Sequence, residues 1–499
     1  MPRPSLHDLG QTHWDVIVVG AGAVGCASAR ELAGRGFKVL LVDRGDIGAG
    51  TSSRSSRMLY SGLGYLAVRY PLWQMVLHPI DMLQRLLYTR DVMRCRAELA
   101  QQMPQHLTRH AFAYPFRKGD RYPPWLVDIG FRLVEALGGW KVPLSYRRVA
   151  PAAAAEKCPL AAGLGKAPRS IGLFEEYMYA WPERICVDTA LDAEARGATL
   201  RTYTRVTRIA QQDGGWIVTL QDAVEPDRAP VHATCDMVIN AAGPWVDRLT
   251  GAGGDQARRI VGIKGVNVMV KLPEAWRGQG LEAFSSKGEP YYVFPWRDHH
   301  FIGPTETHVT DDPDTIRVLD EEIDYILAEA NILFPDLGLT RADVLHTWCG
   351  VRPVTSTDGT TPRNLVRAVQ SPDAPGLVTM TGSTIMLHRH AGRLAARAVE
   401  RHLGRRGPAP TGPIPPPDYD GIGQRLKAEH VVHLTDLIRR RLPDGLNPDL
   451  GRTRAEELSH IAAAALGWNE AQRLDELRLF NEDTARVYGS APRSVDISH

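Results

Sequence analysis

Three glycines near the start of the chain have a spacing that suits phosphate binding. They read Gly20-x-Gly22-x-x-Gly25, follow the apolar run 16–19, and open a helical pattern that continues to Arg35. In this setting the first glycine permits a tight turn, the second lets the backbone approach a pyrophosphate, and the third lets the helix pack on the strand. The positive end of the helix dipole would face the phosphates. The pattern predicts a dinucleotide-binding turn.

An acidic residue stands where such a turn needs one. Asp43 ends the next apolar run, 39–42, about 20 residues beyond Gly22 as the motif requires. A carboxylate at that place can hold the two hydroxyls of a ribose. The alternative is a glycine-rich turn used only for packing, and the register of strand, helix and acid favours the nucleotide. A segment rich in hydroxyl groups and arginine, 48–57, follows and suits further phosphate contacts.

The same sequence pattern, an apolar run followed by a glycine turn and a helical stretch, occurs twice more in the chain. The second copy is the run 237–240 followed by 241–245, and the third is the run 377–380 followed by a helix to about 403. Short apolar runs before helices indicate parallel strands buried on both faces. Because the three copies lie far apart in the chain, we expect one domain assembled from discontinuous segments.

Length and composition limit the class of protein. A chain of 499 residues is too long for one ordinary core, and 43% hydrophobic with 23% charged residues is typical of globular domains. The 59 basic residues exceed the 57 acidic ones too little to indicate a nucleic-acid partner. Six scattered cysteines without a CxxC pair favour a reducing compartment over zinc clusters or a disulfide framework.

The remaining organisation is indicated by periodicity and proline. Neighbouring strands are expected at 291–295 and 301–303, and the aromatic-rich stretches around them suggest alternating strands. Six prolines in 408–417 predict a stiff linker, and amphipathic helices are expected at 424–441 and 455–466. The expected organisation is a nucleotide-binding domain over 1–74, 171–249 and 350–404, a substrate domain over 75–170 and 250–349, a linker at 405–417, and a helical domain over 418–499.

The sequence resembles the FAD-dependent glycerol-3-phosphate dehydrogenase family, within the wider D-amino-acid-oxidase-like flavoproteins. The likeness rests on motifs in the family's order along nearly the whole chain: Gly20–Gly25, 51–56, 62–66, Asn240-Ala-Ala-Gly-Pro-Trp245, Ile263-Lys-Gly265, Gly350-Val-Arg-Pro353, 434–440 and 447–451. The resemblance implies an α/β fold: a Rossmann-like FAD-binding domain of the glutathione-reductase type, an antiparallel-sheet substrate domain and a C-terminal helical domain.

The resemblance also implies a binding site for non-covalent FAD. Its contacts are expected from Gly20, Gly22, Ala23, Gly25, Asp43, Arg44, Thr51, Ser52, Ser53, Ser56, Val206, Ala241, Gly243, Trp245, Arg352, Gly382, Ser383, Thr384 and Ile385. A helix beginning after Gly382 would direct its positive end at the flavin and stabilise negative charge on the reduced ring.

The family oxidises a secondary alcohol by hydride transfer to FAD while a base removes the hydroxyl proton, and electrons pass to a quinone. Arg352 matches a family arginine that would clamp an anion or position the hydroxyl. The base is sought among His388, His390, Tyr60 and Tyr65.

Three expected polar groups are absent from the substrate site. Family members read His-Gly-Gly-Leu-Arg-Tyr where this chain reads Tyr60-Ser61-Gly62-Leu63-Gly64-Tyr65, and a family lysine is replaced at Ser383. Aromatic residues gather instead in 176–181, as an aromatic wall, a cage for a methylated cation, or ordinary core. These departures predict an altered substrate, a small polyol phosphate or related anionic alcohol rather than glycerol 3-phosphate itself.

Several alternatives remain at the level of sequence. An oxidase of amines or amino acids shares the general fold, and a catalytically degenerate flavoprotein would also explain the lost polar groups. His106 and His110 have helical spacing but no third ligand, so zinc is not expected. We expect a cytoplasmic protein without signal peptide or membrane span. The amphipathic stretch 125–134 suits a peripheral contact with the inner face of the cell membrane, and a homodimer stays open.

Overall fold

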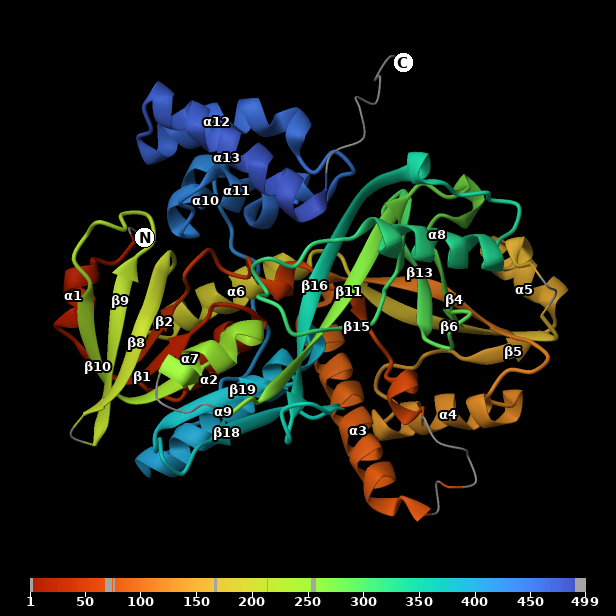
Figure 1. Ribbon diagram of the computed structural model, residues 1–499, viewed down its shortest axis with the longest axis horizontal. Coiled ribbons are helices and arrows are strands. Elements are labelled where there is room, and N and C mark those ends of the chain that lie inside the picture. Colours follow the sequence, from red (N-terminus) through yellow and green to blue (C-terminus); the bar gives the residue numbers. More distant parts are fainter. Residues whose placement is uncertain are drawn as a thin grey trace. The chain divides into compact units, whose positions relative to one another are not determined.

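The computed structural model describes residues 3–67, 74, 77–165, 168–212, 214–252 and 257–489 (Figure 1). The chain divides into two compact units, each assembled from separated segments. The first unit comprises 1–55, 181–263 and 351–483, and the second comprises 56–180, 264–350 and 484–499. The division places 418–483 with the nucleotide-binding segments, and 56–74 with the second unit, unlike the expected organisation. That the chain contains three domains that fold independently stays a prediction.

The first unit is built on an eight-stranded sheet whose central strands are parallel. The order is β18-β19-β10-β1-β2-β7, with β9 and β8 continuing from β10. All three predicted strand–turn–helix copies are confirmed, since β1 pairs in parallel with β10, and β10 with β19. The strands are β1 (His13–Val19), β2 (Val39–Val42), β7 (Thr199–Arg201), β8 (Thr204–Gln212), β9 (Gly215–Asp222), β10 (Val231–Asn240), β18 (Arg367–Gln370) and β19 (Leu377–Thr381).

Helices of the first unit pack around one buried helix. Helix α2 is in contact with both α6 and α9, and the three lie beside the parallel strands in Figure 1. Ten of the twelve residues of α2 are buried, because small side chains let the neighbours approach. The helices are α1 (Leu6–Gly10), α2 (Ala23–Gly34), α6 (Pro182–Ala195), α7 (Val246–Ala252) and α9 (His388–Leu403).

The proline-rich segment packs on this unit instead of hanging free as a linker. A Cβ on Gly34, the last residue of α2, would lie 2.7 Å from the ring of Pro410. A Cβ on Gly407 would lie 2.1 Å from the carbonyl oxygen of Arg35. The stiffness predicted from the prolines therefore serves to lay the chain against the end of α2.

The C-terminal helices (blue in Figure 1) are α10 (Ile422–Ala428), α11 (Leu434–Asp436), α12 (Arg452–Leu466) and α13 (Glu470–Tyr488). The helix expected over 424–441 was wrong as one continuous element. It breaks after Ala428 because His430 has a left-handed φ of 57°, and it resumes as α11 and a wide helical turn at Leu437–Arg441.

Most strands of an eleven-stranded mixed sheet belong to the second unit, whereas 260–263, 351–356 and 362–363 of the same sheet belong to the first. The predicted hairpin is confirmed: β13 and β14 pair antiparallel around a turn at Arg297, whose φ is 52°. The sheet order is β17-β16-β11-β14-β13-β12-β4-β6-β3, with β15 on β11 and β5 on β6. The strands are β3 (Met58–Leu59), β4 (Leu107–Phe116), β5 (Arg147–Val149), β6 (Ser170–Tyr179), β11 (Ile260–Val270), β12 (Gln279–Phe284), β13 (Pro290–Trp296), β14 (His299–Gly303), β15 (Thr307–Val309), β16 (Val344–Ser356) and β17 (Pro362–Arg363).

Four helices complete the second unit: α3 (Pro79–Gln102), α4 (Pro124–Leu137), α5 (Pro151–Lys157) and α8 (Asp320–Leu333). The helix expected around 125–134 is confirmed as α4. The strand-rich expectation for 75–170 missed α3, which is 24 residues long and whose apolar residues follow no single face. His106 and His110 lie in a turn and on β4, so their spacing does not place them on one helix face.

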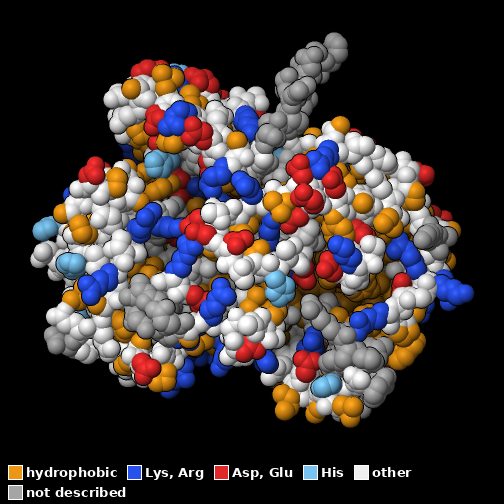
Figure 2. Space-filling model, viewed as in Figure 1, with side chains coloured by type: hydrophobic (Ala, Val, Ile, Leu, Met, Phe, Trp, Pro, Cys, Tyr) orange, Lys and Arg blue, Asp and Glu red, His pale blue; other side chains and the backbone are white. Residues whose placement is uncertain are grey.

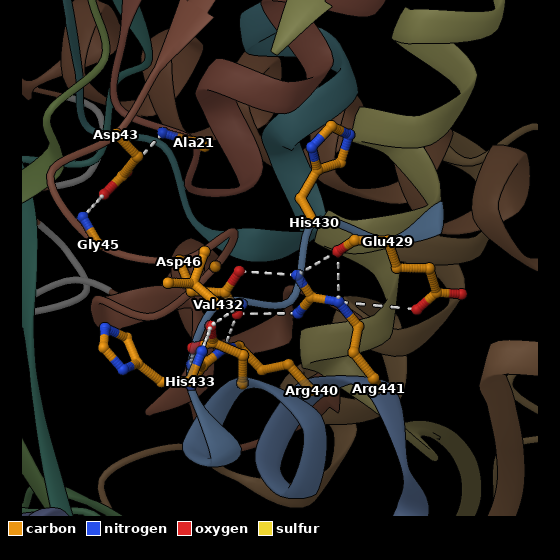
Figure 3. A network of polar contacts seen from close by, with 12 residues as sticks. Ala21, Asp43, Gly45, Asp46, Glu429, His430, Val432, His433, Arg440 and Arg441 are labelled. Atoms are coloured by element: carbon orange, nitrogen blue, oxygen red, sulfur yellow. Dashed lines mark hydrogen bonds and ion pairs between the residues drawn. The ribbon is translucent and has the colours of Figure 1, made fainter. Parts of the chain in front are cut away.

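Buried ion pairs tie the C-terminal helices to the nucleotide-binding part of the first unit. Arg441 donates to both carboxylate oxygens of Asp46, at 2.7 and 2.8 Å, and to the backbone oxygen of Glu429 (Figure 3). Arg440 donates to Asp46 and to Asp436, and Arg184 makes two bonds to Glu429. Arg439, Arg440 and Arg441 end the helical turn Leu437–Arg441, and all three are buried.

Acidic and basic side chains are interspersed on the face shown in Figure 2, without a broad field of one sign there. This mixture agrees with a formal net charge of +2.

The buried ion pair between Asp46 and Arg441 predicts a large loss of stability when one partner is removed. Burial alone would raise the pKa of Asp46, yet Arg441 and Arg440 hold it below its usual value. Arg441→Met leaves this carboxylate buried with one cation fewer, so the free energy of unfolding should fall by about 3–5 kcal/mol. Urea unfolding measures the loss.

Two further variants serve as controls. Arg478→Met removes an arginine from exposed pairs with Asp475 and Glu482 and should leave stability near that of the wild type. The double variant Asp46→Asn with Arg441→Met should lose less stability than Arg441→Met alone, because no unpaired charge is left. Equal losses for Arg441→Met and Arg478→Met would contradict the assignment.

Candidate functional site

The turn between β1 and α2 accepts only glycine at two of its three motif positions. Gly20 has a φ of +103°, and a Cβ there would lie 2.7 Å from the carbonyl oxygen of Ala241. A Cβ on Gly25 would lie 1.7 Å from the carbonyl oxygen of Gly20. These two glycines are therefore required by packing alone, with or without a ligand.

Gly22 is different, because nothing in the fold forbids a side chain there. Its φ of −72° is ordinary, and a Cβ would contact only Ser52 Oγ, at 3.2 Å. No side chain caps the start of α2 at Gly22. The Ala23 N–H donates to Ser52 Oγ at 3.0 Å, which holds this serine beside the turn. The absence of a side chain at Gly22 leaves the helix start accessible to a close ligand.

Asp43 lies at the predicted place, at the end of β2, and braces two loops. Its Oδ2 accepts a bond from the Ala21 N–H at 2.6 Å, and its Oδ1 accepts one from the Gly45 N–H at 2.8 Å (Figure 3). Burial raises the pKa of Asp43, partly opposed by these two donors. The carboxylate therefore fixes the turn to the loop after β2, and its contact with a ribose stays a prediction.

Other predicted FAD residues gather around the same turn in the first unit. The Arg44 guanidinium lies 4.4 Å from the centre of the Trp245 ring, and Trp245 follows Gly243, whose φ is +58°. The Thr51 hydroxyl donates to the carbonyl oxygen of Val351 at 3.0 Å, and the Ser53 hydroxyl donates to Gly48. The segments after β1, β2 and β10 thus meet, as parallel strands of one sheet require.

A second tight turn joins β19 to α9. Gly382 has a φ of +73°, and a Cβ there would lie 2.0 Å from the carbonyl oxygen of Leu365. The Gly382 N–H donates to the carbonyl oxygen of Pro353 at 3.0 Å. This bond places the strand that carries the exposed Arg352 directly beside the turn, and the role of Arg352 as an anion clamp stays a prediction.

The remaining predicted FAD residues are distributed as follows. Ser383, Thr384 and Ile385 continue the turn into α9, and Ser383 Oγ donates to the carbonyl oxygen of Thr384. Val206 lies on β8, paired with Leu220. Ser56 falls in the second unit, apart from the other serines of its motif.

His388 does not fit the role of base. Its side chain is fully buried, and its Nδ1 lies 2.6 Å from the carbonyl oxygen of Ile385, one turn earlier. This geometry is that of a histidine holding the start of α9, so we do not retain His388 as the base. His390 is half-buried on the same helix.

Tyr60 and Tyr65 lie together in the second unit. Their rings meet edge-on with centres 5.6 Å apart. The Tyr60 hydroxyl donates to Glu282 Oε1 at 3.0 Å and accepts a bond from the Gly64 N–H at 2.5 Å. Glu282 was missed at the sequence level, although a lone glutamate in an otherwise apolar strand (279–284) was a usable signal.

The aromatic cage considered for 176–181 is not supported by Tyr179, whose side chain is fully buried. Glu176, from the same segment, accepts bonds from the Ser61 N–H and from Arg96. The guanidinium of Arg96 also lies 5.0 Å from the Tyr177 ring centre. This part of β6 therefore packs within the unit.

FAD fits the donors of the first unit. Gly22, the N-cap residue of α2, has no side chain to cap the helix, and this suits a pyrophosphate because the first N–H groups of a helix lack partners within it. Gly22 leaves the space that a Cβ would take, and the neighbouring Ser52 hydroxyl adds a polar group.

Comparison with known proteins agrees with this geometry. The chain is 29% identical to a glycerol-3-phosphate dehydrogenase of Synechocystis, covering 91% of this chain and 85% of that protein. It is 27% identical to a D-erythritol 1-phosphate dehydrogenase of Brucella abortus, covering 83% and 80%. The resemblance stated from the motifs is thereby confirmed.

Solved structures show the same fold. A glycerol-3-phosphate dehydrogenase from Bacillus halodurans, complexed with FAD, superimposes with a TM-score of 0.61 at 22% identity, covering 97% of this chain and 84% of that one. A glycine oxidase from Geobacillus kaustophilus superimposes with a TM-score of 0.57 at 23% identity, covering 78% and 95%. The family model described as FAD dependent oxidoreductase, DAO, matches residues 15–398. The chain belongs to the DAO family of FAD-dependent oxidoreductases, with FAD as its cofactor.

Proposed function

We propose that this chain is a dehydrogenase that oxidises a secondary alcohol of a small polyol phosphate, or of a related anionic alcohol, to a ketone. The observation that carries the proposal is the exposed Arg352 on β16, held beside the β19–α9 turn by the bond from Gly382 to Pro353. A guanidinium fork matches the geometry of a phosphate or carboxylate. The relatives named for glycerol 3-phosphate and erythritol 1-phosphate support an alcohol bearing a phosphate.

Each part of the chain would have a distinct task. FAD, when bound, supplies the acceptor for the hydride that leaves the carbinol carbon. The start of α2, Gly22 and Ser52 would hold the pyrophosphate of FAD. Arg352 would bind the anionic end of the substrate or position its hydroxyl, which keeps the reacting carbon in one orientation.

The departures from the family favour a substrate other than glycerol 3-phosphate. Gly64 and Ser383 supply neither of the two positive charges expected there, and Tyr60 replaces a histidine. An arginine at position 64 would have to displace the Tyr60 hydroxyl, since a Cβ there would lie 2.7 Å from it. A larger polyol phosphate, which offers more hydroxyls to tyrosines, suits this composition better.

Electrons are proposed to pass to a quinone at a membrane surface. Among the residues that the structure describes, none of the helices combines the length and apolar character that crossing a bilayer demands. However, α3 and α4, which pack together, expose Ile80 (72%), Trp125 (60%) and Ile129 (53%), and basic residues such as Lys118 and Arg121 precede α4. Apolar side chains beside basic ones suit a peripheral contact with anionic lipid, which co-sedimentation with vesicles would test.

Anaerobic bleaching of the flavin tests the proposed activity directly. Erythritol phosphate should reduce the bound FAD, and glycerol 3-phosphate should do so slowly. Bleaching by an amino acid, with none by any polyol phosphate, would instead favour the amine-oxidising alternative.

Loss of FAD from a Gly22 variant tests the cofactor site. Gly22→Val should fold, because a side chain meets only Ser52, but should not retain FAD, because the side chain blocks the approach of the pyrophosphate. The ratio of flavin to protein absorbance measures loading. Gly423→Val is the control, since a Cβ there meets no atom within 4 Å. Normal loading of Gly22→Val would place the cofactor elsewhere.

Substitution of Arg352 tests the anion clamp. Arg352→Ala should lower kcat/KM by about 10²-fold or more, since a charge-assisted bond is lost and the substrate is misplaced. Arg352→Lys should recover part of this loss, because a point charge cannot reproduce the fork. Arg228→Ala, on an exposed turn paired with Glu225, should behave as the wild type. A wild-type kcat/KM for Arg352→Ala would show that the anion is held by other residues.

A further inference from the structure

The loop after β2, residues 43–48, is joined at both ends to one residue of the glycine turn. The Asp43 carboxylate accepts the Ala21 N–H at 2.6 Å, and the Gly48 N–H donates to the Ala21 carbonyl oxygen at 2.8 Å. Ala21 lies in the turn that opens α2. The position of the loop and the position of the helix start are therefore set together.

The middle of this loop is held by the C-terminal part of the chain. Asp46 is buried there, and Arg441 donates to its two carboxylate oxygens at 2.7 and 2.8 Å (Figure 3). Arg440 donates to one of the same oxygens at 2.5 Å. Two cations thus converge on one carboxylate, from positions 394 and 395 residues further along the sequence.

The contacts close into a ring that includes the backbone of the loop. Arg440 also donates to Asp436 Oδ1 at 2.9 Å, and the Tyr203 hydroxyl donates to that same oxygen at 2.7 Å. The Tyr203 N–H donates at 2.9 Å to the carbonyl oxygen of Gly45, the residue before Asp46. The loop is therefore held both by a side chain and by a backbone oxygen, and both routes meet at Arg440.

The C-terminal segment that carries the two arginines is itself fixed. Arg441 Nε donates to the carbonyl oxygen of Glu429 at 3.0 Å, and Arg184 of α6 donates to both carboxylate oxygens of Glu429, at 2.6 and 2.7 Å. Asp436 Oδ2 accepts two backbone N–H groups, at 2.9 and 3.0 Å, from the chain just before α11. The arginines therefore resist a movement of the loop.

Packing alone does not require this arrangement. A buried ion pair often gives no more stability than apolar side chains of the same volume, because both charges lose their water. Paired guanidinium groups instead supply a defined direction and distance, through planar forks that make several bonds. A binding site needs this definition, since its groups must lie within about 0.5 Å of their productive positions. The loop after β2 carries Asp43, the acid expected to bind the ribose.

We propose that Arg440 and Arg441 are positioning residues for FAD. Through Asp46 they hold the loop after β2 where Asp43 and the start of α2 can bind the ribose and the pyrophosphate of the cofactor. The arginines act on FAD only through the loop. This inference rests on the proposed place of FAD beside Gly22 and Asp43. Because coupling between sites is reciprocal, a weaker contact between Asp46 and the arginines means weaker binding of FAD.

Release of FAD from the full-length holoenzyme measures this effect. The double variant Asp46→Asn with Arg441→Met removes the contact without leaving an unpaired carboxylate, so it should fold. After dilution into buffer without FAD, the rise of flavin fluorescence gives the release rate, and adding FAD back to the stripped protein gives the Kd. The Kd of the double variant should rise by about 10-fold or more, within the range usual for coupling between two sites. Tyr203→Phe, which removes one bond of the ring and no charge, should give a smaller rise.

A loss of stability alone would have a different signature. Arg473→Met is the matched control, because this arginine is also buried but bonds within the C-terminal helices. Its partners are Glu456, Glu470 and Ser459. During heating, flavin fluorescence gives the temperature of FAD release and far-UV circular dichroism gives the Tm. In the double variant FAD should leave further below the Tm than it does in the wild type. In Arg473→Met the two temperatures should fall together, with an unchanged Kd.

A wild-type Kd in the double variant would overturn the positioning role, and Tyr203→Phe decides in its place if the double variant does not fold. An equal rise of the Kd in Arg473→Met would overturn it too, since the effect would then be one of general stability. Gly22→Val separates these failures from failure of the FAD site. If Gly22→Val retains FAD, the proposed place of FAD is wrong and the inference is lost with it. If Gly22→Val loses FAD while the double variant binds it normally, only the role of the arginines is wrong.

Discussion

The first unit depends on how closely other parts of the chain approach α2. A Cβ on Gly25 would overlap a carbonyl oxygen of the preceding turn, and a Cβ on Gly392 of α9 would lie 2.7 Å from the carbonyl oxygen of Ala27. At the far end of the helix, Gly34 leaves room for Pro410. Backbone therefore packs on backbone on several sides, which fixes the helix start in space before any ligand arrives. A phosphate site made of N–H groups needs this rigidity, because main-chain donors cannot adjust as side chains do.

Buried carboxylates show two different uses of the same costly group. Asp46 is surrounded by Arg440 and Arg441, so its charge is compensated and its role is to join the C-terminal helices to the loop after β2. Asp43 lies three residues before Asp46, so the ion pairs also hold the segment whose carboxylate bonds to the turn after β1. Glu282 has only hydroxyl partners, and such a group can change its protonation state within an accessible pH range.

Local patterns predicted the strand–turn–helix copies and the hairpin at Arg297, because their signals are glycines and apolar runs within a few residues. They did not predict α3, whose apolar residues follow no single face, or the break at His430, which depends on a left-handed backbone in a non-glycine residue. The burial of Arg441 could not be predicted either, because its partner Asp46 lies 395 residues earlier in the sequence. Local chemistry was thus predictable, whereas pairing between distant segments required the three-dimensional structure.

Two of the positions at which the sequence departs from the family, 60 and 64, are linked in the structure. A Cβ at position 64 would lie 2.7 Å from the Tyr60 hydroxyl, and the Gly64 N–H donates to that same hydroxyl. A side chain at position 64 would have to displace the Tyr60 hydroxyl from its present place, so the residues at positions 60 and 64 depend on each other. The tyrosine in turn reaches Glu282, which gives its hydroxyl an acceptor. At both positions a neutral residue stands where the family has a basic one, and the Gly64–Tyr60 hydrogen bond joins them. Neutral hydroxyl groups can hydrogen-bond a polyol, and binding of an anionic end by Arg352 stays a prediction.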